Sequence, residues 1–138
     1  MLGEALIKIN KVTYMKFILS IMLIALASLF PSFLPDSKGA KIATNYYHKL
    51  MAKDNIQLLI IEGESQLFAV GVSAKKGIFF QKGIIHVNIY ITKEMISYEG
   101  VVDYCKKHKK DLNIERRVKL IFYKGEKENR ESLYKIEL

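Results

Sequence analysis

The sequence contains one cysteine and three histidines among its 138 residues. A single cysteine excludes an intramolecular disulfide framework and a metal cluster held by cysteines alone. The sequence has no internal repeat and no low-complexity tract, which excludes solenoid and collagen-like folds. The motifs G-x-S-x-G, H-E-x-x-H and G-x-G-x-x-G and the phosphate-binding P-loop are also missing, so these familiar signatures of enzymes do not apply.

What is present is a substantial apolar content and an excess of positive charge. Hydrophobic residues make up 50% of the chain and aromatic residues 11%, which excludes a wholly disordered protein. The length suffices for one small domain with a modest core. Lysine and arginine number 22 against 14 acidic residues, giving a formal net charge of +8.

One uncharged apolar segment stands apart near the N-terminus. Of the 18 residues in segment 17–34, 14 are apolar. Its part before the first proline would form a helix of roughly 21 Å, short against a bilayer core of about 30 Å, and the whole segment is at the lower limit for a span. The segment therefore predicts a cleaved signal peptide or an uncleaved signal anchor, with a buried core helix as a third alternative.

The cleavage site and the start of the protein both remain open. Small residues suited to signal peptidase occur in Ala25-Leu26-Ala27, with cleavage before Ser28, and in Ser37-Lys38-Gly39, with cleavage before Ala40. Met15 is followed at once by a lysine and the apolar run, which is itself a complete start of a signal peptide. Initiation at Met15 is therefore an alternative to initiation at residue 1.

The charges around this segment predict its orientation. The basic residues that precede it are Lys8, Lys11 and Lys16, against Glu4. Because the positive flank stays in the cytoplasm, we expect the C-terminal part to be exported. Residues 1–35 then form a leader with a signal peptide or anchor, and residues 36–138 an exported domain. That domain would be periplasmic or secreted after cleavage, and otherwise the outer part of a single-pass membrane protein with a cytoplasmic N-terminus.

Hydrophobic periodicity predicts an α+β fold for residues 36–138. Pro35-Asp36-Ser37 marks the boundary, with Asp36 and Ser37 as suitable helix caps. The expected order is a helix at 38–53, strands at 56–61 and 67–72, a short piece at 78–80 between two hairpin turns, a strand at 85–92, a helix from Thr92 to 112, and strands at 118–123 and 133–138. Short turns between strands favour two helices packed on a curved antiparallel sheet of five or six strands, in the order α-β-β-(β)-β-α-β-β.

The strand at 85–92 alternates strictly, and its polar face offers one candidate site. His86, Asn88 and Tyr90 share that face, where a histidine could act as a functional group. Cys105 and His108 lie three residues apart on a helix, but two ligands do not make a metal site, and Cys105 fits the apolar stripe as a core residue. We predict no metal, no cofactor and no catalytic residue, hence no enzyme.

A basic cluster near the second helix is the strongest surface signal. It comprises Lys106, Lys107, Lys109, Lys110, Arg116, Arg117 and Lys119. Such a cluster attracts acidic partners, although a solvated helix end would look the same. Nucleic acid is a poor partner for an exported domain, and no aromatic residues are interleaved with these lysines for stacking on bases. We expect a protein partner or an anionic envelope surface, with membrane contact through residues 17–34 if they are uncleaved.

Together these features predict a small exported, non-enzymatic binding module of the inhibitor or immunity type, acting on an acidic protein or envelope partner. The alternative is a membrane-anchored structural subunit of an envelope or secretion assembly, and a weaker third is an enzyme that uses His86.

Overall fold

The computed structural model describes residues 13–22 and 35–138, and the chain separates into two compact units. Residues 13–22 are helical. The fold lies in the unit formed by Asp36–Gly77 and Gln81–Leu138. Within the described residues, we find no helix with both the length and the apolar character needed to cross a membrane. From residue 23 onward, the predicted signal or anchor segment lies outside the described residues.

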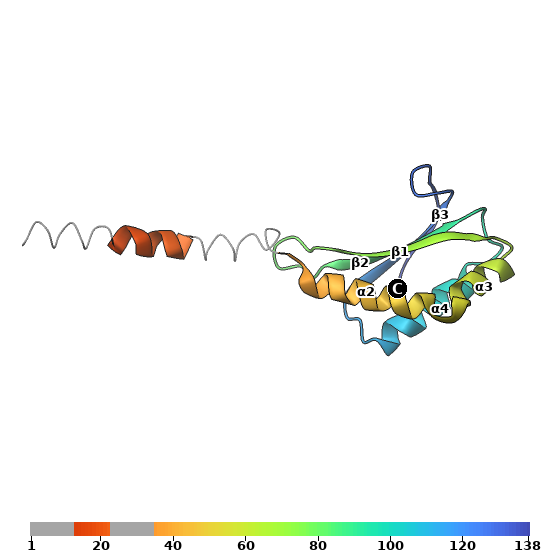
Figure 1. The fold of residues 1–138 in the computed structure, drawn as a ribbon, viewed down its shortest axis with the longest axis horizontal. Helices are drawn as coiled ribbons and strands as arrows, with labels where there is room; N and C mark the ends of the chain where they lie inside the picture. The colour runs from red at the N-terminus through yellow and green to blue at the C-terminus, as the bar shows by residue number, and fades with distance from the viewer. Residues whose placement is uncertain (1–12, 23–34) are drawn as a thin grey trace, which may run out of the picture. The chain divides into compact units, whose positions relative to one another are not determined.

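A four-stranded mixed sheet forms one layer of this unit (Figure 1). Its strands are β1 (Leu67–Lys75), β2 (Ile84–Ile91), β3 (Arg117–Lys124) and β4 (Glu131–Glu137), which are hydrogen-bonded in that order. β1 with β2 and β3 with β4 are antiparallel pairs, whereas the central pair of β2 and β3 is parallel. The described part of the chain thus forms an α+β fold, as predicted.

Helices form the second layer and lie on one face of the sheet (Figure 1). They are α2 (Ser37–Met51), the 3-10 turn η2 (Ala52–Asp54), α3 (Asn55–Glu62) and α4 (Glu99–Asp111). The segment that contains α4 connects β2 to β3, and such a crossover is what allows these neighbouring strands to run parallel.

The predicted start of the first helix is confirmed. The Asp36 carboxylate accepts a hydrogen bond from the Gly39 backbone N–H at 3.0 Å, which caps α2. The Arg116 guanidinium donates two hydrogen bonds to the same carboxylate, at 2.8 and 3.0 Å. This bidentate pair ties the start of α2 to the loop before β3.

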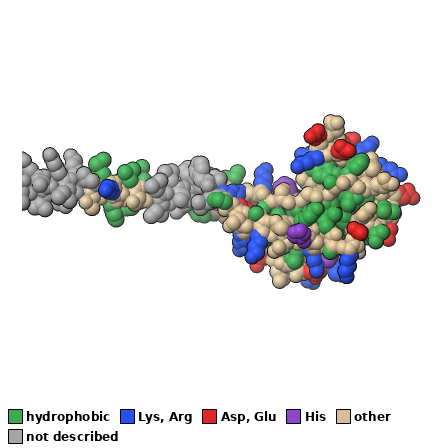
Figure 2. Space-filling model, in the orientation of Figure 1, with side chains coloured by type: hydrophobic (Ala, Val, Ile, Leu, Met, Phe, Trp, Pro, Cys, Tyr) green, Lys and Arg blue, Asp and Glu red, His purple; other side chains and the backbone are tan. Residues whose placement is uncertain are grey.

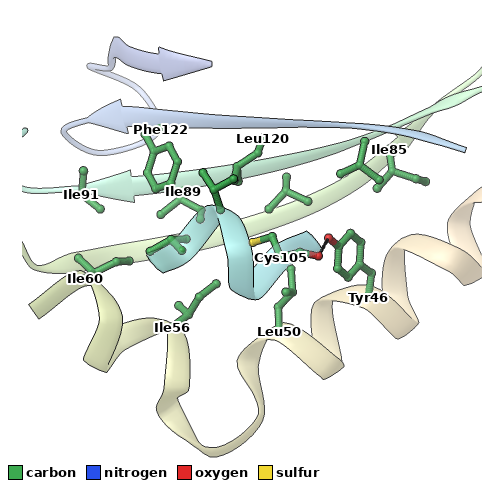
Figure 3. Close-up of a cluster of buried hydrophobic side chains, with 14 of the residues drawn as sticks. Tyr46, Leu50, Ile56, Ile60, Ile85, Ile89, Ile91, Cys105, Leu120 and Phe122 are labelled. Carbon is green, nitrogen blue, oxygen red and sulfur yellow. Dashed lines mark hydrogen bonds between the residues drawn. The ribbon is translucent and has the colours of Figure 1, made fainter. Parts of the chain in front are cut away.

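The core lies between the two layers (Figure 3). The alternation in β2 gives a fully buried row on the helix side, formed by Ile85, Val87, Ile89 and Ile91. Helices α2 and α4 are also joined by buried polar contacts, since the Tyr46 hydroxyl donates to the Cys105 carbonyl at 2.6 Å, and the partly buried Tyr104 hydroxyl donates to the Leu50 carbonyl at 2.9 Å. Burial raises the pKa of the Tyr46 phenol, so Tyr46 acts as a donor at neutral pH.

The prediction of a strand at residues 56–61 is wrong, because this segment belongs to helix α3. Ile56 and Ile60, four residues apart, point into the core, whereas Leu58 and Ile61 are about half exposed. Lys53 and Asp54 both have positive φ, which ends α2 and turns the chain before α3 begins. A short apolar run in the sequence is compatible with both a buried strand and a helix. In the structure this segment is a helix that packs one face against the core.

The predicted sheet needs two further corrections. The described residues form four strands where five or six were expected, since 56–61 is helical and Ile78–Phe80 lies in the turn between β1 and β2. The sheet is mixed and not purely antiparallel, since β2 and β3 are parallel. The described helical layer contains three α-helices, where two were expected.

The cap predicted at Thr92 is also wrong. Helix α4 begins at Glu99 and has Tyr98 in the capping position. The Thr92 side chain instead accepts a hydrogen bond from the Gln66 backbone N–H at 3.1 Å and lies 3.3 Å from the Ser65 hydroxyl. Thr92 therefore joins the end of β2 to the turn after α3.

Candidate functional site

The sheet face opposite the helices, here called the open face, carries the three residues predicted as a sheet-face site. His86, Asn88 and Tyr90 alternate with the core residues of β2 and so point away from the helical layer. Strand register places each of them in a row across the sheet. The rows are Ser73, His86, Lys119 and Glu137; Gly71, Asn88, Ile121 and Lys135; and Ala69, Tyr90, Tyr123 and Ser132.

The first two rows hold buried polar atoms that lack a partner. His86 Nε2 and Asn88 Oδ1 are covered from solvent and have no hydrogen-bond partner among the described residues. A depression of about 320 Å³ lies beside His86, and its lining residues are His86, Lys119, Leu120, Ile121, Lys135, Ile136 and Glu137. Asn88 is not in this lining, although its partner in the strand register, Ile121, is. Because such atoms are costly to leave unpaired, this part of the open face is suited to a ligand that supplies hydrogen bonds.

The electrostatic setting of His86 favours its neutral form. Burial lowers the pKa of the imidazole, and the nearby charges of Lys119 and Lys75 lower it further. The carboxylate that lines the same depression, that of Glu137, is paired with Arg117. A neutral imidazole flanked by lysines is a hydrogen-bonding group in a positive field, which favours an acidic ligand.

Tyr90 is placed differently from the other two predicted residues. Its ring stacks on Tyr123 with centroids 5.4 Å apart, and its hydroxyl accepts a hydrogen bond from Arg130 at 3.1 Å. The Arg130 guanidinium also lies 4.5 Å from the centroid of the Tyr123 ring, a cation–π contact. Since Tyr90 is only 4% exposed, it closes one end of the open face and is not free to meet a ligand.

The seven predicted basic residues do not form one continuous surface. Lys106, Lys107 and Lys110 are exposed on α4, whereas the Lys109 ammonium donates to the Leu138 carbonyl at 2.9 Å. Lys119 lies on the open face beside His86. The remaining two are paired, Arg116 with Asp36 and Arg117 with Glu137.

The structure adds lysines that the sequence did not single out. The β1–β2 loop meets the start of α2, because the Lys76 charge acts on the Asp36 carboxyl and Arg116 packs against Gly83. A depression of about 360 Å³ at this end is lined by Lys38, Ile42, Lys82, Asn113, Glu115 and Arg116. We call this region, with the loop and the starts of α2 and β3, the hairpin end. Lysines on both sides of a turn were the sequence signal that could have indicated it.

Figure 2 agrees with this distribution of charge. On the face shown, basic side chains predominate at the hairpin end, whereas acidic and basic side chains are mixed at the opposite end of the domain. The α4 lysines line a further shallow depression of about 370 Å³ together with Asn113, Ile114 and Glu115.

Cys105 and His108 do not come together as a metal site. Cys105 is fully buried in the core, which confirms its prediction as a core residue, and burial raises the pKa of its thiol to about 12. His108 packs edge-on against Tyr104 and lies 3.5 Å from Asp111. Across residues 13–22 and 35–138, no three His, Cys, Asp or Glu side chains are grouped so that they could hold a metal ion.

Comparisons of the chain with protein families, with curated proteins and with solved structures gave no match.

Proposed function

We propose that residues 36–138 form an exported, non-enzymatic binding module whose open face takes an acidic segment of a partner protein. The observation that supports this most is the depression where His86, Lys119 and Lys135 meet. A carboxylate there would gain two ammonium groups and could accept a hydrogen bond from a protonated His86 Nε2, whereas Asn88 Oδ1 would need a donor, such as a backbone N–H of the same acidic segment.

A binding role fits these groups better than catalysis does. General acid–base chemistry needs a group with a pKa near the working pH and a second group that orients it. The pKa of His86 is lowered, and lysines are the charged groups that act on it. The third hypothesis, an enzyme based on His86, Asn88 and Tyr90, is also weakened by Tyr90, which Arg130 and Tyr123 cover.

The test is the binding of a fluorescent octaglutamate peptide to the full chain in nonionic detergent. We expect binding at low ionic strength that weakens as salt is added, since screening acts on exposed charges. The double variant K119E/K135E should weaken binding several-fold. The matched control K106E/K107E reverses two exposed lysines on α4 and should have a smaller effect.

Two results would contradict this proposal. Equal losses in the two double variants would mean that only net charge matters, and a larger loss in K106E/K107E would move the acidic partner to α4. If the wild-type chain does not bind octaglutamate even at low ionic strength, the acidic partner itself is wrong.

Export remains part of the proposal, and the described fold bears on how it would occur. Cleavage before Ala40 would remove Asp36, which caps α2 and pairs with Arg116. Cleavage before Ser28, or retention of residues 17–34 as an anchor, leaves that pair intact and is therefore favoured. With the anchor retained, the alternative of a membrane-anchored structural subunit gains support. The intact mass of the mature chain and its presence in the soluble or membrane fraction separate these cases.

A further inference from the structure

The loop between β1 and β2 ends in three exposed apolar residues, Ile78–Phe80. Their side chains are 64%, 59% and 91% exposed, and Phe80 is the most exposed large apolar side chain of the described residues. A β-turn in water has no need of two adjacent phenylalanines, because turns favour small and polar residues. Contiguous exposed apolar groups of this kind mark contact with a membrane or a partner.

The backbone holds this apolar tip in a defined conformation. Gly77 and Gln81 approach so closely that a Cβ at Gly77 would collide with the Gln81 carbonyl, which closes the loop below the tip. Phe79 has a φ of 61°, in the left-handed region that bulky residues rarely occupy. Asparagine or glycine would suit that conformation better, so the presence of a phenylalanine there points to a role for its side chain.

Lysines frame the tip on both sides. Lys75 and Lys76 precede it and Lys82 follows it. The Lys82 ammonium forms an ion pair with the Glu115 carboxylate at 3.7 Å, and both side chains are open to solvent, 75% and 85% exposed. Lys38, in the first turn of α2, lines the same depression as Lys82. An apolar tip that is flanked along the chain by lysines matches the layering of an anionic bilayer surface, with an apolar interior below negative headgroups.

We propose that Ile78–Phe80 enters the interfacial layer of an anionic membrane, while Lys75 and Lys82 contact lipid phosphates. Aromatic side chains favour that layer, and lysines add attraction to acidic lipids. This proposal does not rest on the binding of an acidic protein, and the two surfaces share only Lys75, whose charge also acts on His86.

The position of the tip along the chain favours a lipid occupant over a protein. The uncharged apolar segment ends at residue 34, and α2 begins at Ser37. Three residues span about 10 Å at most, so a segment 17–34 within a bilayer would keep the start of α2 at its surface. The base of the β1–β2 loop lies at this same end of the domain, where the Lys76 charge acts on Asp36.

Tryptophan fluorescence can test this proposal, because the chain contains no tryptophan. The variant F80W would carry its only indole at the tip. The matched control I96W would place it at a residue that is 72% exposed in the segment between β2 and α4, where the β1–β2 loop does not reach. Both full-length variants are reconstituted into vesicles of phosphatidylcholine with phosphatidylglycerol, with or without brominated acyl chains as contact quenchers.

We expect F80W to show a blue-shifted emission and strong quenching by brominated lipid, and I96W to show neither. The additional changes K75E/K82E, or vesicles of phosphatidylcholine alone, should reduce the quenching of F80W. Equal quenching of F80W and I96W would overturn the proposal. A blue shift of F80W without quenching would also overturn it, because the tip would then be covered by protein and not by lipid.

Discussion

At the hairpin end of the domain, an ion pair connects the secondary-structure elements. The Arg116 guanidinium, in the loop before β3, donates two hydrogen bonds to the Asp36 carboxylate at the start of α2. At the opposite end, here called the α3 end, apolar burial of α3 and the hydrogen bonds of Ser65 join the elements. Both ends also expose apolar residues, Phe80 at one and Ile96 at the other. Phe80 has Lys75 and Lys76 before it and Lys82 after it in the sequence, whereas Ile96 follows Lys93 and Glu94.

This difference shows that an exposed apolar side chain indicates a binding surface only when the residues around it also fit a partner. The exposed residues of α3, Leu58 and Ile61, lie on the same helix as the buried Ile56 and Ile60, and any small domain can carry such residues. The residues of the tip have Lys75 and Lys76 before them and Lys82 after them, and the close approach of Gly77 and Gln81 closes the loop below them. If the comparison is right, substitutions at the α3 end should change mainly stability, and those in the loop should change mainly membrane contact.

The largest expected effect is at the α3 end. Ile60 is fully buried, so Ile60→Ala should lower the free energy of unfolding by about 3 kcal/mol through lost burial and a cavity. Its neighbour Ile61 is 51% exposed, and Ile61→Ala should change stability by less than about 1 kcal/mol. Urea unfolding followed by circular dichroism measures both. Similar losses in the two variants would contradict the helical assignment of this segment.

The ion pair at the hairpin end should contribute somewhat less. Asp36→Ala removes a helix cap and both hydrogen bonds from Arg116, and should cost about 2 kcal/mol. Asp36→Asn keeps a capping oxygen and should cost less than Asp36→Ala does. A cost of Asp36→Ala above that of Ile60→Ala would reverse the comparison of the two ends.

This pair also predicts an acid dependence. The Arg116 hydrogen bonds hold the pKa of Asp36 below its usual value of 3.8. The stability from this ionised carboxylate is therefore present above pH 3.8 and is lost as the pH falls through the lower pKa of the folded chain. Wild-type protein should lose stability in this range more steeply than Asp36→Asn, as measured by urea unfolding at successive pH values.

Ser65 gives a smaller test of the α3 end. It is 4% exposed, and its hydroxyl donates to the Lys93 carbonyl at 2.7 Å and accepts from the Lys93 N–H at 3.2 Å. Ser65→Ala leaves both backbone groups without this partner and should cost about 1.5 kcal/mol. The exposed Ser73 on β1 is the control, and Ser73→Ala should cost about 0.5 kcal/mol or less. Equal thermal shifts of the two variants would show that the Ser65 contacts do not stabilise the turn.

The smallest effect concerns the pH dependence of the open face. Burial lowers the pKa of His86 below 6.5, so the stability gained from its neutral form is present above pH 6.5 and is lost as the pH falls below it. The decline in unfolding free energy between pH about 7 and about 5 should be smaller in His86→Gln than in wild type. An unchanged decline in His86→Gln would mean that the imidazole is not desolvated.

The sequence predicted the elements whose periodicity is long or strict. The alternation of residues 85–92 correctly gave β2 and its two faces, and the spacing in residues 38–53 gave α2 with its cap at Asp36. The sequence prediction failed at residues 56–61, because a segment of six residues is too short to distinguish the helical period of 3.6 from the strand period of 2. The candidate site was found in part, since His86 and Asn88 lie together in the structure but Tyr90 is covered by Arg130, which is distant in sequence.

By itself, the sequence determined the α+β class, the burial of Cys105, the capped start of α2 and the excess of positive charge, because each follows from local spacing or composition. Tertiary structure alone decided which charges face solvent and which strands are neighbours. It paired Arg116 with Asp36, brought Lys119 beside His86 and set β3 parallel to β2. These contacts join residues far apart in the chain, and their energies depend on burial and on the crossover through α4, which no local pattern encodes.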